Sequence, residues 1–322
     1  MSQQDGMGAR VHLVVTCANR KTRPVPSLLR LRQVAGRTPA ARAAAWVAQL
    51  EGSAEATLPA RELYAGEHWQ IVRALEETAA MAGLNTSLWV CSAGYGLISV
   101  DARLRPYAAT FAGGHPDSVG AHANNRSQWW AALAGWPGPA LGAPRTLRDL
   151  AGQEPHAVFL LALSSTYLAA CADDVQGAVA RLASPEHLTV ISAGVRASGP
   201  LAACLVPASA RLQPALGGTR QSLNVRILAH LLRHPGDALT HTRIRGVLAE
   251  LLAAAPPLTR YARAPRTDAQ VATFIRRRLT VDPGTTASRL LREFRDRGYA
   301  CEQSRFAAVY RALREDPDVY AC

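Results

Sequence analysis

The sequence nearly lacks lysine. Of its 36 basic residues 35 are arginines, and Lys21 is the one lysine in 322 residues. An ammonium group is a compact donor whose pKa shifts on burial, whereas a guanidinium stays charged and binds through a planar fork. Two interpretations of Lys21 follow: a chemical role that arginine cannot fill, or a chance survivor in an arginine-rich composition.

Paired cysteines and long apolar runs are also missing. The six cysteines include no Cys-x-x-Cys pair, so we expect reduced thiols, no zinc site and no disulfide framework. We also expect no cofactor. No apolar stretch reaches the ~20 residues needed to cross a bilayer. Residues Met1 to Arg10 lack the charged and then apolar pattern of a signal peptide. We therefore expect a globular, cytoplasmic protein without a membrane partner.

Acidic residues are scarce relative to arginine, and the formal net charge is +12. A basic surface attracts polyanions through counterion release and long-range steering. Residues 20–42 contain seven basic groups and no acidic one, and residues 189–248 contain seven arginines and only Asp237 as an acid. These segments, called the first and second basic strips, predict that DNA, single- or double-stranded, is the partner. Arginines that merely solvate helices are the alternative.

Short apolar runs alternate with helical periodicity in the first two thirds of the chain. Buried strands are predicted at residues 11–16, 88–92, 157–164 and 188–192, and helices between them at 40–50, 68–82 and 173–182. This alternation predicts an α/β fold with a mainly parallel sheet flanked by helices. Ligands of such sheets bind at the carboxyl ends of the strands. Polar or glycine-containing loops follow three of the strands there, at 17–21, 92–96 and 192–196.

Later segments differ in composition. Residues 113–144 are rich in Gly, Pro, Asn and Trp and predict a long ordered loop, which Trp129, Trp130 and Trp136 fix to the body unless they form a stacking platform for bases. Residues 219–233 predict an amphipathic helix. Prolines in 251–265 indicate a linker. We therefore expect a catalytic or nucleobase-binding domain at 1–255 and a helical module at 266–322.

Three predicted helices make up the C-terminal module, at 268–279, 286–297 and 304–314. This spacing fits a helix-turn-helix or winged-helix module, although such modules also dock proteins. Ser304 and Arg305 open the third helix, where a recognition helix contacts base edges and phosphates. Arg276 and Arg277 of the first helix are expected to contact the DNA backbone.

Three motifs in residues 10–111 resemble those of an uncharacterised bacterial family. They are a Cys-x-x-x-Lys loop at 17–21, a Pro-Ala-Arg-x-Leu-Tyr box at 59–64, and a Ser-Ala-x-Tyr-Gly-Leu loop at 92–97 followed by Pro106-Tyr107. More distantly, the chain resembles the uracil-DNA-glycosylase superfamily, an α/β fold whose loops grip an extruded base. In several branches of that superfamily the loop after the first strand carries an Asn or Asp that positions water. Asn19 is the matching residue here.

The resemblance implies a DNA glycosylase that removes a base, plausibly a modified one, in defence against phage. Cleavage of an N-glycosidic bond places positive charge on the sugar, so the site needs an anion or a polarised water. Asn19 or Asp101 is expected to orient that water. Lys21 is expected to hold a phosphate, in preference to attacking the sugar carbon as an amine.

Base flipping also requires stacking groups and phosphate clamps. The residues expected to contact the base are Cys17, Ser92, Gly94, Tyr95, Tyr107 and Phe111, and those expected to contact DNA in the α/β part are Arg20, Arg23, Arg196, Arg220 and Arg226. Two alternatives stay open. One is a non-catalytic DNA-binding regulator that senses a nucleotide. The other is a nucleoside or tRNA (deoxy)ribosyltransferase with a carboxylate nucleophile such as Asp101.

Overall fold

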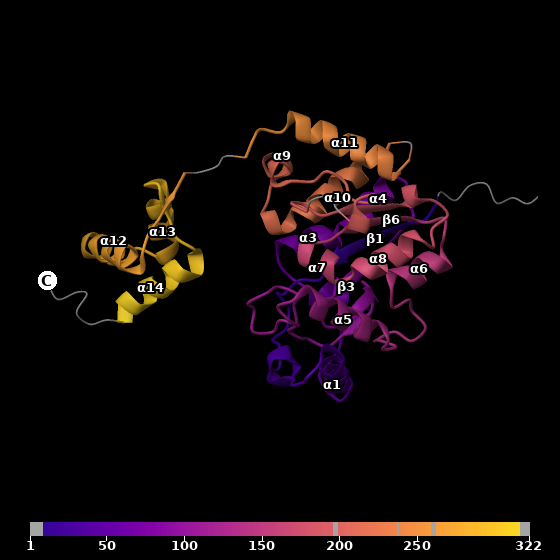
Figure 1. Cartoon of the computed structure of the whole chain (residues 1–322), viewed down its shortest axis with the longest axis horizontal. Helices are drawn as coiled ribbons and strands as arrows, with labels where there is room; N and C mark the ends of the chain where they lie inside the picture. The colour runs from indigo at the N-terminus through magenta and orange to yellow at the C-terminus, as the bar shows by residue number, and fades with distance from the viewer. Residues whose placement is uncertain (1–8, 196–198, 237, 259–261, 316–322) are drawn as a thin grey trace, which may run out of the picture. The chain divides into compact units, whose positions relative to one another are not determined.

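The chain divides into two compact units, Met1–Pro256 (unit 1) and Pro257–Cys322 (unit 2). The computed structural model describes residues 9–195, 199–236, 238–258 and 262–315 (Figure 1). The sequence had placed the two parts at 1–255 and 266–322. Within the described ranges, no helix is both long enough and apolar enough to cross a membrane.

A five-stranded sheet in the order β4-β3-β1-β6-β7 forms the centre of unit 1. Its strands, in that order, are Gly96–Ser99, Thr86–Ser92, Val11–Thr16, Val158–Ala162 and Leu188–Ile191. All neighbouring strands are parallel except β4, which is antiparallel to β3. The predicted mainly parallel α/β sheet is therefore confirmed. Each of the four apolar runs forms one strand because β-branched and apolar side chains pack well in a sheet covered on both faces.

Helices cover both faces of this sheet. Figure 1 shows α4 (Leu75–Met81) and α10 (Leu223–Arg233) on one side of β1 and β6, and α6 (Leu147–Gln153) and α8 (Ala172–Val179) on the other. In the sheet, β3 lies beside β1 on one edge, and β6 and then β7 lie on the opposite edge of β1. The strand order thus reverses between β1 and β6. In open α/β sheets, ligands bind outside the carboxyl ends of the strands at this kind of switch point.

Three predicted boundaries need correction. Residues 113–144 are not a loop throughout, because α5 spans Ala123–Ala134 and buries Trp129 and Trp130. The helix expected at 68–82 is two helices, α3 (Glu67–Arg73) and α4, which meet at Ala74. The predicted linker begins too early, since α11 (His241–Ala254) extends into it. In each case glycine and proline mark the flanks of a segment, whereas packing decides its interior.

The remaining elements of unit 1 are the 13-residue helix α1 and several short helices, strands and turns. They are α1 (Pro39–Glu51), β2 (Leu58–Pro59), α2 (Ala60–Leu63), β5 (Arg103–Leu104), α7 (Ser165–Ala170) and α9 (Gln213–Leu216), together with 3₁₀ turns at Ser27–Leu29, Leu31–Gln33, Pro185–His187, Gly199–Leu201, Ala210–Leu212 and Arg220–Ser222. Strand β2 pairs antiparallel with β5.

Unit 2 contains three helices and a short parallel strand pair. The helices are α12 (Asp268–Val281), α13 (Ala287–Asp296) and α14 (Gln303–Glu315), and β8 (Ala264–Pro265) pairs with β9 (Tyr299–Ala300). A reciprocal capping box between Thr267 and Gln270 begins α12. Apolar residues from all three helices, among them Ile275, Phe294 and Phe306, form a separate core.

Candidate active site

A cavity of about 510 Å³ lies at the switch point between β1 and β6. Thr16, Cys17, Ala18, Asn19 and Arg20 line it at the end of β1, and Ser164, Thr166 and Tyr167 line it after β6. Its other walls come from the segment that leads into α3 (Ala65, Gly66, Glu67 and His68), from Thr110 and Ala112, and from Thr219 and Gln221 before α10. The cavity therefore lies at the strand edge where the sequence predicted a site.

Glu67 contributes a firmly anchored carboxylate to this cavity. Its Oε1 accepts hydrogen bonds from the backbone N–H of Thr219 (3.0 Å), from the Ser222 hydroxyl (2.8 Å) and from the Arg226 guanidinium (2.9 Å). These donors, the Thr219 N–H first, lower the pKa of Glu67 to about 2. Within the described residues Oε2 has no hydrogen-bond partner. The anchored carboxylate thus stays ionised and keeps one oxygen for a molecule in the cavity.

Gly218 permits this anchoring. Its φ is +72°, and a Cβ at this position would lie 2.4 Å from Glu67 Oε1 and 2.1 Å from Arg226 Nε. Only glycine allows the backbone both this conformation and this close approach.

His68 lies next to Glu67 and also lines the cavity. Its Nε2 is 3.1 Å from the carbonyl oxygen of Thr16. A carbonyl only accepts, so Nε2 carries the proton and Nδ1 carries the lone pair. Burial lowers the pKa of His68 below the ordinary value of 6.5, although the Thr16 carbonyl opposes this shift. His68 is therefore a neutral imidazole with a free basic nitrogen at neutral pH.

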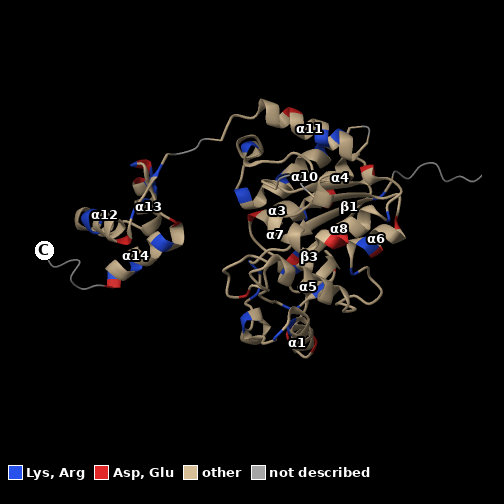
Figure 2. Cartoon of the chain, in the orientation of Figure 1, with Lys and Arg blue, Asp and Glu red and all other residues tan. Residues whose placement is uncertain are grey.

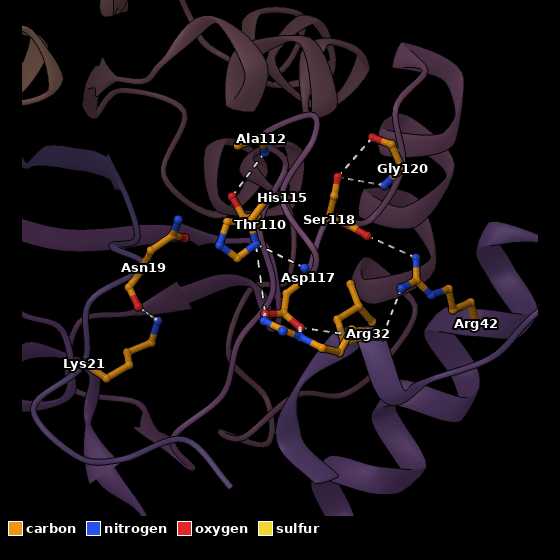
Figure 3. A network of polar contacts seen from close by, with 11 residues as sticks. Asn19, Lys21, Arg32, Arg42, Thr110, Ala112, His115, Asp117, Ser118 and Gly120 are labelled. Carbon is orange, nitrogen blue, oxygen red and sulfur yellow. Dashed lines mark hydrogen bonds and ion pairs between the residues drawn. The ribbon is translucent and has the colours of Figure 1, made fainter. Parts of the chain in front are cut away.

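Three of the residues expected in the site do line the cavity: Cys17, Asn19 and Arg20. The side chains of Asn19 and Arg20 are exposed, whereas Cys17 is buried and its Sγ lies 3.1 Å from the Tyr167 hydroxyl. In Figure 3 the carboxamide of Asn19 points toward the loop that carries Thr110 and away from Lys21 Nζ. The loop after β1 thus presents a carboxamide, a thiol and a guanidinium.

Lys21 turns inward instead of reaching the surface. Its Nζ donates to the carbonyl oxygen of Asn19 (3.2 Å; Figure 3) and to that of Ala18 (2.6 Å). It lies 4.5 Å from the centre of the Tyr107 ring and 5.0 Å from that of Tyr64. It does not line the cavity. This position supports neither the expected phosphate contact nor attack on a sugar. Lys21 instead fixes the shape of the loop that carries Asn19.

The pKa of Lys21 is about 8, below its ordinary 10.5, because burial disfavours the ammonium form. Selective carbon-13 labelling of lysine gives a single side-chain signal, which we expect to titrate near this value; a midpoint near 10.5 would place the side chain in solvent. Between about pH 8 and 10.5 the Lys21 amine keeps its proton more often in the unfolded chain than in the folded one. From this group alone, the free energy of unfolding therefore rises with pH between about 8 and 10.5.

Five residues expected to contact the base are part of the core. Ser92, Gly94, Tyr95, Tyr107 and Phe111 are buried. Ser92 Oγ is 2.6 Å from the Tyr107 hydroxyl and accepts from the N–H groups of Gly94 and Tyr95, and a Cβ on Gly94 would lie 2.3 Å from the Tyr107 ring.

Two tryptophans explain why the loop after β3 is closed. Trp46 of α1 donates to the carbonyl of Gly94 and Trp129 of α5 donates to that of Ala93, each at 2.8 Å. The sequence did not predict that these helices cover the loop.

Asp101 lies away from the cavity. It follows β4, and because β4 is antiparallel to β3, its end lies at the edge opposite the carboxyl ends of β1 and β6. Its carboxylate accepts from Arg61 Nε at 2.5 Å, and Arg61 also pairs with Glu76 at 3.2 Å. This position supports neither of the roles expected for Asp101.

The first basic strip is used largely inside unit 1. Arg42 donates to four backbone carbonyls, Arg30 donates to that of Val25, and Arg32 pairs with the buried Asp117 (Figure 3). A guanidinium carries five donors and thus suits irregular loops with many unpaired carbonyls. Arg20 and Arg23 stay exposed, and no ion-pair partner for either exists within the described chain.

The second basic strip likewise contains both arginines bound within the fold and exposed ones. Arg226 binds Glu67, Arg211 donates to Pro256, and Arg220 is exposed. Arg196 lies outside the described residues. Figure 2 shows basic residues spread over many elements with acidic residues among them.

Of the predicted DNA contacts in unit 2, Ser304 and Arg305 are bound within the unit, whereas the side chains of Arg276 and Arg277 make no such contact with the described residues and are exposed. The carboxylate of Glu302 accepts from the N–H groups of Ser304 (3.0 Å) and Arg305 (2.9 Å), and the Arg305 side chain pairs with Asp268 at 2.6 Å. The first turn of α14 is thus engaged with its own unit. Arg276 and Arg277 are exposed on α12.

Sequence reasoning missed Glu67 and His68. They follow Tyr64, the last residue of the Pro-Ala-Arg-x-Leu-Tyr box, by three and four positions, and this proximity was the available signal. Among the described residues, no group of three or more His, Cys, Asp or Glu side chains is placed to hold a metal ion. Comparisons with protein-family models, curated proteins and solved structures give no match.

Proposed function

We propose that unit 1 is an N-glycosidase that releases a nucleobase, plausibly a modified one, from DNA. The observation that carries the proposal is the anchored and ionised carboxylate of Glu67 beside the neutral imidazole of His68 in the switch-point cavity. A cavity of about 510 Å³ is within the range of small-ligand sites. An anion fixed before the reaction stabilises the positive charge that develops on the sugar.

In this mechanism a water oxygen forms a bond to the anomeric carbon as the N-glycosidic bond breaks. The bonding electrons leave with the base, which then takes up a proton. His68 Nδ1 accepts the proton of the attacking water, and the Oε2 atom of Glu67 faces the cationic sugar. Asn19 orients the water or the base edge. Base recognition falls to the small polar groups at the cavity wall, which are Thr110, Ser164, Thr166 and Gln221.

The preference for DNA over a free nucleoside rests on charge. Arg20 lines the cavity, and Arg23 and Arg220 are exposed in segments next to lining residues. Together with the net charge of +12, these guanidinium groups favour a polyanionic substrate.

A (deoxy)ribosyltransferase is the second candidate, favoured by the Oε2 atom of Glu67, which accepts no hydrogen bond from any described residue. There the carboxylate itself bonds to the anomeric carbon as the N-glycosidic bond breaks and the first base leaves, and a second base then displaces the carboxylate. Exchange of a labelled free base into a nucleoside, without DNA, would distinguish this activity from hydrolysis. A regulator without catalysis would bind DNA and release no base at all.

Replacement of Asn19 by Ala is expected to lower the rate of base release by about 10²-fold, within the range for loss of one positioned polar group. The assay incubates the full chain with modified and unmodified DNA and then heats it in alkali, which breaks the strand at each abasic site. Asn124→Ala is the control, because Asn124 is exposed on α5, undergoes the same substitution and does not line the cavity. Equal strand breakage by wild type and Asn19→Ala would remove Asn19 from the mechanism.

A further inference from the structure

Unit 2 contains a concave site of its own, with a volume of about 360 Å³. Two elements supply most of its wall: the first turns of α12, with Gln270, Thr273 and Phe274, and the β8–β9 region, with Arg266 and Tyr299. Phe294 of α13 also lines it. The site therefore combines aromatic rings with a guanidinium and a side-chain amide.

The aromatic wall is ordered by ring contacts. Phe294 is buried, and its ring centre lies 5.0 Å from that of Phe274 and 5.1 Å from that of Tyr299. Phe274 and Tyr299 are only partly buried. An apolar core residue thus supports two rings that stay accessible at the site.

Guanidinium groups lie over both accessible rings. The Arg266 guanidinium carbon is 4.1 Å from the centre of the Tyr299 ring, and that of Arg297 is 5.3 Å from the centre of Phe274. Flat cationic groups stacked on aromatic rings also stack on nucleobases. The wall thus offers a stacking surface that accepts any base.

Polar groups at the site suit a base edge and a phosphate chain. Gln270 uses its Oε1 to accept from the Thr267 N–H, which leaves its amide NH₂ to donate. Arg277 lies one helical turn after Thr273 on the same face of α12 and is exposed. Unit 2 has 13 arginines against eight acidic residues, so its charge complements a polyanion.

Duplex recognition by α14 is less well supported, because Arg305 pairs with Asp268 and the Glu302 carboxylate occupies the first turn. We propose that the site lined by Arg266, Phe274 and Tyr299 binds an unpaired nucleobase, so that unit 2 holds single-stranded nucleic acid. Arg277 then contacts the adjoining phosphate. A concave site admits a base only when that base is out of the helical stack.

The test measures the affinity of the full chain for a fluorescent thymidine oligonucleotide and for a duplex of equal length. Tyr299→Leu and Arg266→Gln are each expected to weaken single-strand binding about tenfold, the loss expected for one stacked base. Duplex binding is expected to change much less. Arg292→Gln is the matched control. It removes the same charge as Arg266→Gln, but Arg292 is exposed on α13 and does not line the site.

Equal losses for Arg266→Gln and Arg292→Gln, with none for Tyr299→Leu, would overturn the proposal, because binding would then be electrostatic only. Parallel losses for single strand and duplex would overturn it too. Unchanged single-strand affinity in all variants would assign the site to another occupant, such as a peptide. Since Arg266 is only partly buried and lies outside the apolar core of unit 2, Arg266→Gln keeps the test valid if Tyr299→Leu fails to fold. None of these outcomes bears on Glu67, on which the proposed function rests.

Discussion

Replacement of Glu67 by Gln is expected to lower the rate of base release by about 10³-fold, which is the upper range for removing one charge-stabilising group from an active site. Glutamine keeps an oxygen that accepts from Thr219, Ser222 and Arg226, so the local fold is preserved. The substitution removes only the negative charge. Single-turnover kinetics with enzyme in excess isolate this chemical step.

Two carboxylates serve as controls for this substitution. Glu76→Gln changes a glutamate that pairs with Arg61, and Asp101→Asn changes the residue that the sequence had placed in the site. Both residues lie outside the cavity lining, so both variants are expected to retain the wild-type rate. A full loss in Asp101→Asn with none in Glu67→Gln would reverse the assignment.

The pH dependence separates Glu67 from His68. Glu67, with a pKa of about 2, stays ionised throughout the usual assay range. Protonation of His68 therefore limits the rate on the acid side, and because its pKa is lowered, the loss begins only below 6.5. A loss of rate that begins above 6.5 would point to a different base.

Replacement of Lys21 by Arg is expected to lower the free energy of unfolding of unit 1 by roughly 2–6 kcal/mol. Overfilling of a packed site costs about 1–3 kcal/mol, and a carbonyl that loses its donor costs about 1–3 kcal/mol more. Ala18 and Asn19 supply the two carbonyls, and the Tyr64 and Tyr107 rings lie 5.0 and 4.5 Å from Nζ, so the larger guanidinium has to displace its neighbours or leave these carbonyls. A requirement for an ammonium at this position would account for the single lysine in a chain that otherwise uses arginine.

Urea unfolding monitored by tryptophan fluorescence measures this effect, because all six tryptophans lie in unit 1. Arg20→Lys is the matched control, since it makes the reverse exchange on an exposed neighbour and is expected to change stability little. A Lys21→Arg variant as stable as wild type would show that the ammonium is not required.

The four parallel strands of the sheet were predictable because each is a short apolar run, whereas β4 was not predicted. The edge that carries the cavity followed from the parallel order of those four strands. Lys21 was placed in the correct loop, but nothing local shows that its side chain turns toward Tyr64 and Tyr107. Asp101 was misplaced because the antiparallel direction of β4 is set by a tight turn. The role of Glu67 depends on donors at 219–226, some 150 residues later, which no local pattern connects to it.

The roles of individual arginines could not be predicted from the sequence either. Charge counts predict a basic chain correctly, but they do not distinguish an exposed guanidinium such as Arg23 from Arg42, which binds backbone carbonyls within the fold. That distinction depends on which loops leave carbonyls unpaired, and hence on tertiary structure.

The most direct test of the account is chromatographic detection of free base released from DNA by the full chain, with abasic sites counted in the same sample. We expect equal amounts of free base and abasic sites with wild type and almost none of either with Glu67→Gln. Absence of free base from every modified and unmodified DNA tested, or equal release by wild type and Glu67→Gln, would contradict it.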